Sequence, residues 1–507
     1  MRHHSSAALE KLLLAAILAL ALALRLPCLT WGLPPATPEV AASDLRCSYA
    51  LDEDDVLSGA ARMQPAKLQI DPGFYRWGAL HFLLVSPALG LAEAAGAFDR
   101  PWRDAYYNLR PGDFDRVYAA GRLVSVVMGL FGIVATFLLG RELAGAATGL
   151  WAALLVAVSP AHLLGSTQIR VDLTMVALVT LAAWLGLRAQ RAPTPRLWLL
   201  LGLASGLALA AKYIAALLVL PVLVAALKSS RFPAPSIGRV LAGAGAGLLL
   251  GHPQWLWLHN EIFGQIQEAL RASSATPEAF RIPAPSLLAM NGFNAARFLI
   301  GPIAAVLAAV GIWRMPGPIL GALGGGVVSL VLLRWPLLRY QLPVLPFLAV
   351  AAAAAMARFP AIWRALAGAA MIIFPLAASI AQVHYMRSRH PANEMLPVIL
   401  RSVPPGTAIA RLIAEMPPLD RKLYPMGPNP LLDDLRPVLP LWVLLTDLPQ
   451  QDYRVSNLEL LRERFEVVAE YRLDRIFGWA TLGESGAPHD WKYTHPSLTL
   501  YRRRSLL

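Results

Sequence analysis

Charged side chains are scarce in this sequence. Lys, Arg, Asp and Glu make up 15% of the 507 residues, whereas an ordinary soluble domain has about 25%. With a mean hydropathy of +0.51, this composition excludes an ordinary soluble chain and predicts a protein that spans a membrane several times. The formal net charge of +13 does not indicate nucleic-acid binding, because Lys and Arg lie mostly between apolar segments.

Cysteine and the common catalytic motifs are also scarce or absent. Cys28 and Cys47 are the two cysteines, which excludes a disulfide framework and leaves either one disulfide or two free thiols. The sequence contains no P-loop, HExxH, CxxC or GxSxG pattern. Arg25, Pro27 and Trp31 follow the first apolar run where a signal peptide would carry small residues, so we expect an uncleaved N-terminal helix.

Apolar windows of about twenty residues predict an all-α polytopic membrane protein with eleven spans. They lie near residues 12–33, 117–139, 146–163, 171–188, 197–211, 213–228, 238–257, 293–313, 317–333, 341–357 and 365–384. With the N-terminus in the cytoplasm, the inner turns carry Lys and Arg and the outer segments carry most acids, as the positive-inside rule requires. An odd number of spans places the C-terminal residues outside the cytoplasm.

Two further regions are expected on the outer side. The first outer loop, residues 34–115, is too long for a plain connector, and its helical segments predict amphipathic helices that cover a cavity. We expect a transmembrane catalytic domain over 1–384. Residues 385–507 contain segments typical of strands, LPLWVLLTD, FEVVAEYRL and SLTLYRR, and one with helical spacing, LELLRERF, which together predict a small α/β domain.

Ionisable residues in or beside membrane spans are costly to bury and are therefore candidates for function. Asp52, Glu53, Asp54 and Asp55 form the first such group, in the outer-loop segment YALDEDDVLSGAARM. Four acids in a row are also typical of a solvated helix start, where they favour the positive end of the helix dipole. The residues alone leave both interpretations open.

Three further groups map to the predicted outer face. Arg170 and Asp172 begin the fourth span, and residues two apart on a helix do not face each other. Lys212 interrupts an apolar pair of spans, where it either extends to lipid headgroups or enters a site. Arg334 and Arg339 precede a span on its outer side. Cations here run against the positive-inside rule, so we expect an anionic partner such as a phosphate.

The order of these segments along the chain is informative. Arg25 in LALRLP is followed by Asp52-Glu53 in LDEDDVLSGAARM, by DPGFYRWGALHFLL, and by Asp172 at the end of GLWAALLVAVSPAHLLGSTQIRVD. GLASGLALAAKYIAALLVLP and RYQLPVLPFLAVAAA come next. Over residues 25 to 355 this series resembles the GT-C class of membrane glycosyltransferases. It is most similar to the dolichyl-phosphate-mannose–protein mannosyltransferase-like family (family 39) and its bacterial lipid A aminoarabinose transferase relatives.

The resemblance implies a GT-C fold in a bacterial plasma (inner) membrane. It implies an inverting transfer of a sugar from a polyprenyl-phosphate donor to a glycan, lipid or protein acceptor at the outer face. Asp52 would be the general base, Glu53 would support it, and Asp172 would orient the acceptor or the sugar hydroxyls or anchor a cation. The donor-phosphate ligands that the resemblance implies are Lys212, Arg339, Arg170 and Tyr340.

Several alternatives stay open at this point. The residues do not distinguish hexosyl from pentosyl transfer, and they do not identify the acceptor. Some relatives use a divalent metal, but no ligand set is apparent here, so no cofactor is expected. The main functional alternative is a transporter or flippase for lipids or lipid-linked sugars. Against it, the chain lacks visible repeat halves and its charges gather at one face. A non-catalytic scaffold leaves those charges unexplained.

Overall fold

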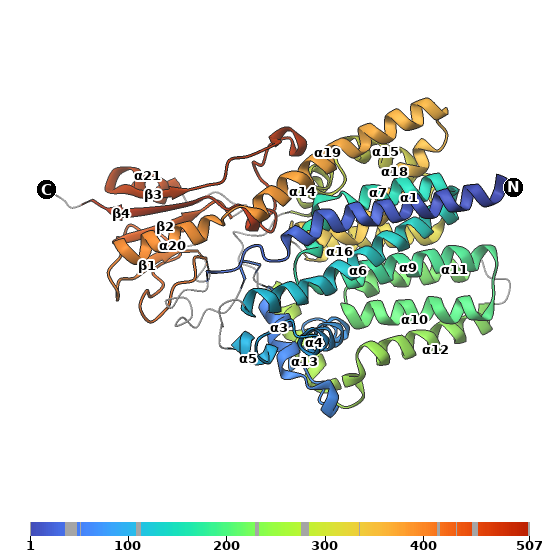
Figure 1. Cartoon of the computed structure of the whole chain (residues 1–507), viewed down its shortest axis with the longest axis horizontal. Helices are drawn as coiled ribbons and strands as arrows, with labels where there is room; N and C mark the ends of the chain where they lie inside the picture. The colour runs from blue at the N-terminus through green and yellow to red at the C-terminus, as the bar shows by residue number, and fades with distance from the viewer. Residues whose placement is uncertain are drawn as a thin grey trace.

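The computed structural model describes residues 2–35, 48–50, 52–107, 113–228, 233–274, 283–333, 335–412, 416–431, 433–448 and 455–504. Most of these residues are helical. The long helices run roughly parallel along the longest axis of the molecule, and a small sheet lies beyond one end of them (Figure 1). Helix α1 begins at the end of the bundle away from the sheet (Figure 1).

Five helical segments in the described ranges are long and apolar enough to cross a membrane. They are Ala7–Cys28, Asp113–Ala144, Val171–Arg191, Leu338–Met356 and Ala361–Ser402. The helices that form them are α1 (Arg2–Arg25) with η1 (Leu26–Cys28), α6 (Asp113–Ala144), α9 (Val171–Arg191), α17 (Leu338–Gln341) with η6 (Leu342–Val344) and α18 (Leu345–Met356), and α19 (Ala361–Arg387) with α20 (Pro391–Ser402). Helices α7 (Ala146–Ala157) and α8 (Pro160–Ser166), bent by 63°, count together as a sixth. The chain is therefore a multi-pass membrane protein.

The other five predicted windows also fall on apolar helices. These are α10 (Pro195–Ala211), α11 (Ala215–Lys228), α12 (Pro233–Gly251), α15 (Pro302–Ile312) and α16 (Gly317–Leu333). Their continuous apolar stretches are 10–17 residues long, shorter than a span needs. The position of each predicted helix is thus found in the structure, whereas the number of eleven spans stays a prediction.

Close packing of α10 on α12 depends on glycine. A Cβ atom added at Gly202 or Gly206 would lie 2.1 or 2.0 Å from the carbonyl oxygen of Val240 or Ala244. Small residues four apart let two membrane helices approach to backbone contact. Because α10 ends at Ala211, this packing also fixes the position from which the Lys212 side chain extends.

The predicted first outer loop folds into its own layer at the sheet end of the bundle. It contains α3 (Asp52–Arg62), η2 (Pro65–Lys67), α4 (Leu80–Ala94) and α5 (Trp102–Tyr107), and α13 (His259–Ser274) lies close by (Figure 1). Leu57 on α3, Phe82 on α4 and Trp102 on α5 share one buried apolar cluster. The helical segments predicted in this loop are therefore present as α3 and α4.

The C-terminal residues form a small mixed sheet. Its strands are β1 (Ile409–Arg411), β2 (Trp442–Thr446), β3 (Phe465–Tyr471) and β4 (Leu498–Arg503), in the order β1-β2-β4-β3. β1 is parallel to β2, and β4 is antiparallel to both of its neighbours. The three segments predicted as strands are β2, β3 and β4, and the predicted helix is α21 (Val455–Arg464). Helix α19 continues past residue 384, and the domain division there stays a prediction.

Short helical segments complete the connections between these elements. They are η3 (Pro253–Leu256), α14 (Ala284–Asn294), the π-helical segment η5 (Ala295–Leu299), η7 (Gly478–Thr481) and η8 (Lys492–Thr494).

Candidate active site

Helix α3 begins at Asp52 and carries all four acids of the run in its first turn. The predicted helix start is therefore confirmed. The four carboxylates have different surroundings: Asp52 lines a cavity, whereas Asp54 accepts a hydrogen bond from the Tyr106 hydroxyl at 2.5 Å. Asp55 lies near enough to Asp52 and Asp54 for their charges to act on it. Burial and these two charges raise its pKa to about 6.

The cavity lies where five parts of the chain meet. Its lining comes from the start of α3, the loop before α4, the start of α9, the end of α10 and the start of α17. The lining residues are Asp52, Trp77, Arg170, Val171, Asp172, Lys212, Arg339 and Tyr340, around a space of about 280 Å³ that opens to solvent. Six of the seven site residues expected from the sequence thus share one cavity.

Ion pairs connect the charged residues of the cavity. The Asp52 carboxylate lies 3.0 Å from an Arg339 guanidinium nitrogen and 3.4 Å from one of Arg170. Lys212 donates a hydrogen bond of 2.8 Å from Nζ to Oδ1 of Asp172. Lys212 therefore enters the site rather than extending to lipid headgroups.

Breaks in the helices bring these cations to the cavity. Lys212 follows the last residue of α10 and has an extended backbone, with φ −158° and ψ 126°. Arg170, just before α9, is extended as well, with φ −138° and ψ 141°. Irregular backbone is tolerated at membrane depth where it lines a cavity or is buried in protein. The Tyr340 ring lies 5.5 Å from Lys212 Nζ and 5.3 Å from the Arg339 guanidinium carbon, within cation–π range.

The surrounding cations control the ionisation of Asp52. Burial alone would raise the pKa of this carboxyl, but the charges of Arg339, Arg170 and Lys212 lower it below its ordinary value. Asp52 is therefore a carboxylate at neutral pH.

The Arg170 guanidinium has donor atoms that make no hydrogen bond within the described part of the chain. Its side chain is 4% exposed, and its Nε and Nη2 groups have no hydrogen-bond acceptor among the described residues. Leaving a buried donor unpaired costs about 1–3 kcal/mol. An anion in the cavity would satisfy these donors.

Glu53 does not line the cavity. It is fully buried and accepts two hydrogen bonds from the Arg122 guanidinium, at 2.8 and 2.6 Å. It also accepts the backbone N–H of Ile169 at 2.7 Å and the hydroxyl of Ser48. These bonds connect α3 to α6 and to the residue before Arg170. Glu53 therefore holds the backbone beside two cavity residues, Asp52 and Arg170.

Arg25 likewise lies outside the cavity. It is fully buried, and its guanidinium donates to the Ser166 hydroxyl at 2.8 Å and to the carbonyl oxygen of Ala157 at 3.1 Å. It also lies 2.8 Å from Nδ1 of His162. These partners belong to α7 and α8, so Arg25 stabilises the bend between them.

Two residues at this end of the molecule were not predicted. Arg122 carried a detectable signal, because an arginine inside the window 117–139 is expensive in a membrane. Trp77 carried none, because an aromatic residue in a loop is usually a packing residue. Of the residues singled out earlier, Arg334 and Cys47 lie outside the described ranges, and Cys28 is buried.

The donor set of the cavity does not fit a divalent metal. Its two carboxylates, Asp52 and Asp172, are both paired with cations. No group of three His, Cys, Asp or Glu side chains within the described ranges could hold a metal ion. We therefore derive no step through a metal.

One known protein family resembles this chain over part of its sequence. The sequence profile of the dolichyl-phosphate-mannose-protein mannosyltransferase family matches residues 114–257. This range contains Arg122, Arg170, Asp172 and Lys212. A search of curated protein sequences found no match.

Among solved structures that resemble this chain, one reaches a TM-score of 0.50. ArnT from Cupriavidus metallidurans in the apo state has a TM-score of 0.50 and 14% identity, over 98% of this chain and 98% of that chain. ArnT bound to undecaprenyl phosphate has a TM-score of 0.47 and 13% identity, over 96% and 97%. Archaeal oligosaccharyltransferase AglB from Archaeoglobus fulgidus, in complex with an inhibitory peptide and a dolichol-phosphate, has a TM-score of 0.47 and 13% identity, over 78% and 58%.

The chain thus has the fold of ArnT and, over residues 114–257, the sequence pattern of dolichyl-phosphate-mannose-protein mannosyltransferases. Together these confirm the predicted resemblance to the GT-C class of membrane glycosyltransferases.

Proposed function

We propose that this protein transfers a sugar from a polyprenyl-phosphate donor to an acceptor at the outer face of a bacterial plasma membrane, with inversion. The observation that carries the proposal is the cavity in which Asp52 and Asp172 meet Arg170, Lys212 and Arg339. The matching family profile is named for enzymes that use dolichyl-phosphate mannose, which is a sugar linked to a polyprenyl phosphate.

The charge of the cavity matches such a donor. Three cations, Arg170, Lys212 and Arg339, face two carboxylates, so the ionised cavity has a net charge of +1. A sugar linked to a polyprenyl through one phosphate is a phosphodiester with a single negative charge. Its phosphate would neutralise the cavity and supply hydrogen-bond acceptors for Nε and Nη2 of Arg170, of which Nη2 makes an ion pair with Asp52 but no hydrogen bond to a described residue.

In the proposed reaction, the acceptor hydroxyl attacks the anomeric carbon from the face opposite the phosphate, which inverts the configuration. Asp52 accepts the hydroxyl proton. The bond between the anomeric carbon and the phosphate oxygen breaks, and its electron pair stays on the leaving polyprenyl phosphate. Arg339, Lys212 and Arg170 stabilise that charge in a partly buried site, where electrostatic interactions are stronger than in water.

The ion pairs also support an order of binding in this proposal. Without donor, Arg339 pairs with Asp52 and Lys212 pairs with Asp172. The donor phosphate competes with both carboxylates for these cations. Once Arg339 binds the phosphate, its effect on the pKa of Asp52 weakens, and the carboxylate becomes a stronger base. Asp172 is released to orient a hydroxyl of the sugar or the acceptor. The donor therefore binds before the acceptor.

The remaining expected roles follow from the contacts. Glu53 supports Asp52 by holding the start of α3 against Arg122. Tyr340 positions Lys212 and Arg339 through its ring. We further propose that the N-terminus lies in the cytoplasm and that the cavity and the sheet lie outside it.

Sugar transfer in proteoliposomes tests the proposal. The purified protein is supplied with polyprenyl-phosphate sugars, labelled in the sugar, and with a membrane extract as the source of acceptor. We expect label to enter the acceptor while polyprenyl phosphate is released. Lys212→Gln should lower donor use on the order of 10²-fold, because it removes one cation from the leaving phosphate.

A second lysine provides the matched control. Lys228 is the last residue of α11 and is exposed, away from the cavity lining. Lys228→Gln should transfer sugar at the wild-type rate. An equal rate in Lys212→Gln would contradict the donor-phosphate assignment. Movement of labelled lipid between leaflets without release of polyprenyl phosphate would instead favour the flippase alternative.

A further inference from the structure

Residues 478–495, which we name the docking segment, connect the C-terminal sheet to the membrane helices. The Arg297 guanidinium in η5 donates a hydrogen bond of 2.8 Å to the carbonyl oxygen of Thr481. The Trp491 ring packs 4.6 Å from that of Phe298. Because these contacts come from both ends of the docking segment, it lies along the outer ends of the helices rather than in solvent.

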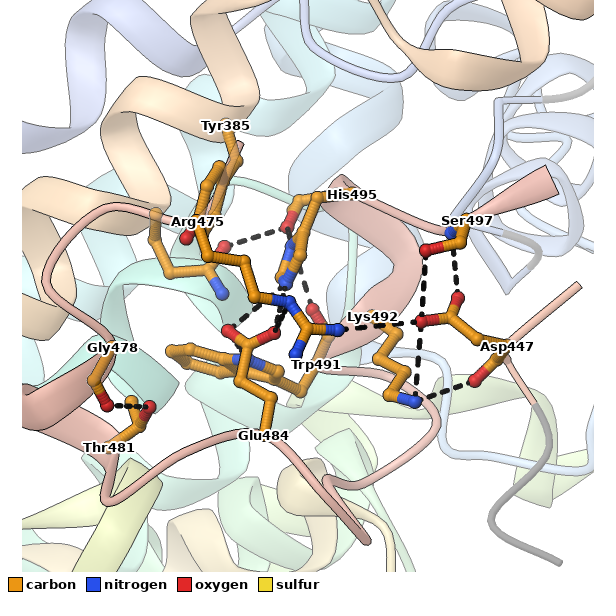
Figure 2. Close-up of polar contacts among 12 residues, drawn as sticks. Tyr385, Asp447, Arg475, Gly478, Thr481, Glu484, Trp491, Lys492, His495 and Ser497 are labelled. Atoms are coloured by element: carbon orange, nitrogen blue, oxygen red, sulfur yellow. Dashed lines mark hydrogen bonds and ion pairs between the residues drawn. The ribbon is translucent and has the colours of Figure 1, made fainter. Parts of the chain in front are cut away.

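A polar cluster holds the docking segment in shape. Figure 2 shows the Glu484 carboxylate between Arg475 and His495, with Trp491 beside it. Its oxygens lie 3.2 Å from Arg475 Nε, from His495 Nε2 and from Trp491 Nε1. These three partners belong to the C-terminal region and none of them lines the cavity, so this cluster stabilises the docking segment without contacting the cavity.

Asp490 makes a different kind of contact. Its side chain is 3% exposed and accepts two backbone N–H groups at the start of α17, from Leu338 at 2.8 Å and from Arg339 at 2.9 Å. The first N–H groups of a helix have no acceptor within the helix, and a carboxylate there also favours the helix dipole. Asp490 therefore fixes the backbone of Arg339, whose side chain contacts Asp52.

We propose that Asp490 is a positioning residue for Arg339, so that the C-terminal region completes the active site of the transferase. This inference rests on the proposed function, in which Arg339 binds the donor phosphate. A displacement of a substrate-positioning group by about 1 Å can reduce the rate about a hundredfold. The two bonds from Asp490 hold Arg339 against such a displacement.

The simpler explanation is that Asp490 only anchors the C-terminal region. The docking segment has other anchors, including Arg297 and Trp491, that do not involve α17. Asp490 uses both oxygens on the start of α17, the helix that carries the cavity cation Arg339. An anchor would affect folding and the KM of both substrates, whereas a positioning residue for Arg339 raises the KM of the donor and not that of the acceptor.

Steady-state kinetics of Asp490→Asn separates the two explanations. Asparagine keeps the shape but has one carbonyl oxygen and no charge, so it cannot accept both N–H groups as the carboxylate does. We expect kcat/KM for the donor to fall about ten- to a hundredfold, with the acceptor KM unchanged. Equal increases in the KM of donor and acceptor would overturn the positioning role.

Asp447 provides the matched control. Its carboxylate accepts the backbone N–H of Ser497 at 2.7 Å and lies 3.5 Å from Nζ of Lys492, as Figure 2 shows, so it anchors the same segment from the sheet side. Asp447→Asn should retain the donor KM of the wild type. If it raises that KM as much as Asp490→Asn does, anchoring explains the effect and the proposal is wrong. Asp490→Glu keeps both oxygens and should recover part of the loss.

A double-mutant cycle with Arg339→Gln makes the test independent of folding yield. If Asp490 acts through Arg339, adding Asp490→Asn to Arg339→Gln should reduce activity less than about twofold further. A further loss as large as in the wild-type background would contradict the proposal. Wild-type protein that transfers no sugar would overturn the proposed function, and this inference with it. Active wild type with an unaffected Asp490→Asn would overturn this inference alone.

Discussion

Asp52 and Glu53 are neighbours in the sequence but belong to two different clusters of acids and arginines. In the cavity, Asp52 lies 3.0 Å from Arg339 and keeps 27% of its side chain exposed. Behind the cavity, Glu53 and Arg122 are both fully buried, with their closest atoms 2.6 Å apart. The same two chemical groups, a carboxylate and a guanidinium, therefore occur side by side in an open and a closed arrangement.

The two clusters differ in how fully their polar groups are paired. Glu53 accepts hydrogen bonds from Arg122, Ile169 and Ser48, which leaves no room for a ligand. In the cavity, Arg170 keeps two donors without an acceptor among the described residues, and the cations outnumber the carboxylates. A fully paired cluster stabilises the fold, whereas an incompletely paired one is prepared for a charged ligand.

The largest expected effect is on catalysis, from Asp52→Asn. If Asp52 is the general base, this change should lower sugar transfer about 10²- to 10⁴-fold. The thermal unfolding temperature should fall only slightly, because the cations that lower the pKa of Asp52 lose a partner, but the carboxylate is partly exposed and its ion pairs are screened by solvent. Transfer of labelled sugar and a thermal melt of the same preparation measure both quantities.

Asp54→Asn is the control for that variant. It changes an acid of the same helix turn, whose carboxylate contacts Tyr106 rather than the cavity. It should transfer sugar at close to the wild-type rate. Normal transfer by Asp52→Asn together with a large loss in Asp54→Asn would show that Asp54, and not Asp52, is the base.

In the closed cluster of Glu53 and Arg122, we expect a substitution to lower the stability of the fold, whereas in the cavity Asp52→Asn mainly lowers sugar transfer. Arg122→Leu leaves the fully buried Glu53 carboxylate without its partner, and removing one member of a buried pair costs about 3–5 kcal/mol. We expect a marked fall in unfolding temperature, measured in detergent by intrinsic fluorescence. The double variant Glu53→Gln with Arg122→Leu should recover part of this stability. A melt of Arg122→Leu equal to wild type would show that the pair is dispensable.

A third cluster, around Glu484, tests whether complete pairing predicts a stabilising role elsewhere. Burial alone would raise the pKa of Glu484, but hydrogen bonds from His495 and Trp491 and the charge of Arg475 lower it to about 2 from 4.5. A carboxyl with a lowered pKa in the folded state stabilises the fold above its unfolded pKa. That stabilisation is lost as the pH falls from about 4.5 towards 2.

Glu484→Gln should therefore unfold more easily than wild type at neutral pH, by about 1–3 kcal/mol. The difference between the two melts should shrink as the pH falls through that window. A difference that stays constant down to pH of about 2 would mean that the charge of Glu484 is not what stabilises the docking segment.

Much of this architecture was accessible from the sequence for a physical reason. A membrane helix needs a long apolar run, so each window predicted a helix at the right place. An ion at membrane depth is expensive, so Asp172, Lys212 and Arg339 stood out, and the structure places them together. The span count does not follow in the same way, because several apolar helices are shorter than the windows suggested.

The supporting contacts were not accessible in this way. Glu53 looked like a companion of Asp52, and only the folded chain shows that its partner is Arg122, which is 69 residues away. Asp490 lies 152 residues from Leu338, in a region without a recognisable motif. Contacts over such distances depend on tertiary packing, which neither local periodicity nor the cost of a buried charge specifies.

The smallest expected effect concerns the pH profile of the cavity. Arg339, Arg170, Lys212 and His489 all lower the pKa of Asp52, against the effect of burial, and Arg339 contributes most. The base form of Asp52 is lost as the pH falls through that pKa, so a higher pKa makes activity fail at a higher pH. Arg339→Gln should therefore move the acid limb of kcat/KM for the donor, which reports the enzyme before the donor binds, to higher pH, in addition to lowering donor use. Lys228→Gln should leave the limb in place. An acid limb that stays at the wild-type pH in Arg339→Gln would mean that this limb does not report Asp52, or that Arg339 does not pair with it in solution. Either explanation would remove the difference between the open cluster of Asp52 and the closed cluster of Glu53. The assignment of Asp52 as the base depends on that difference.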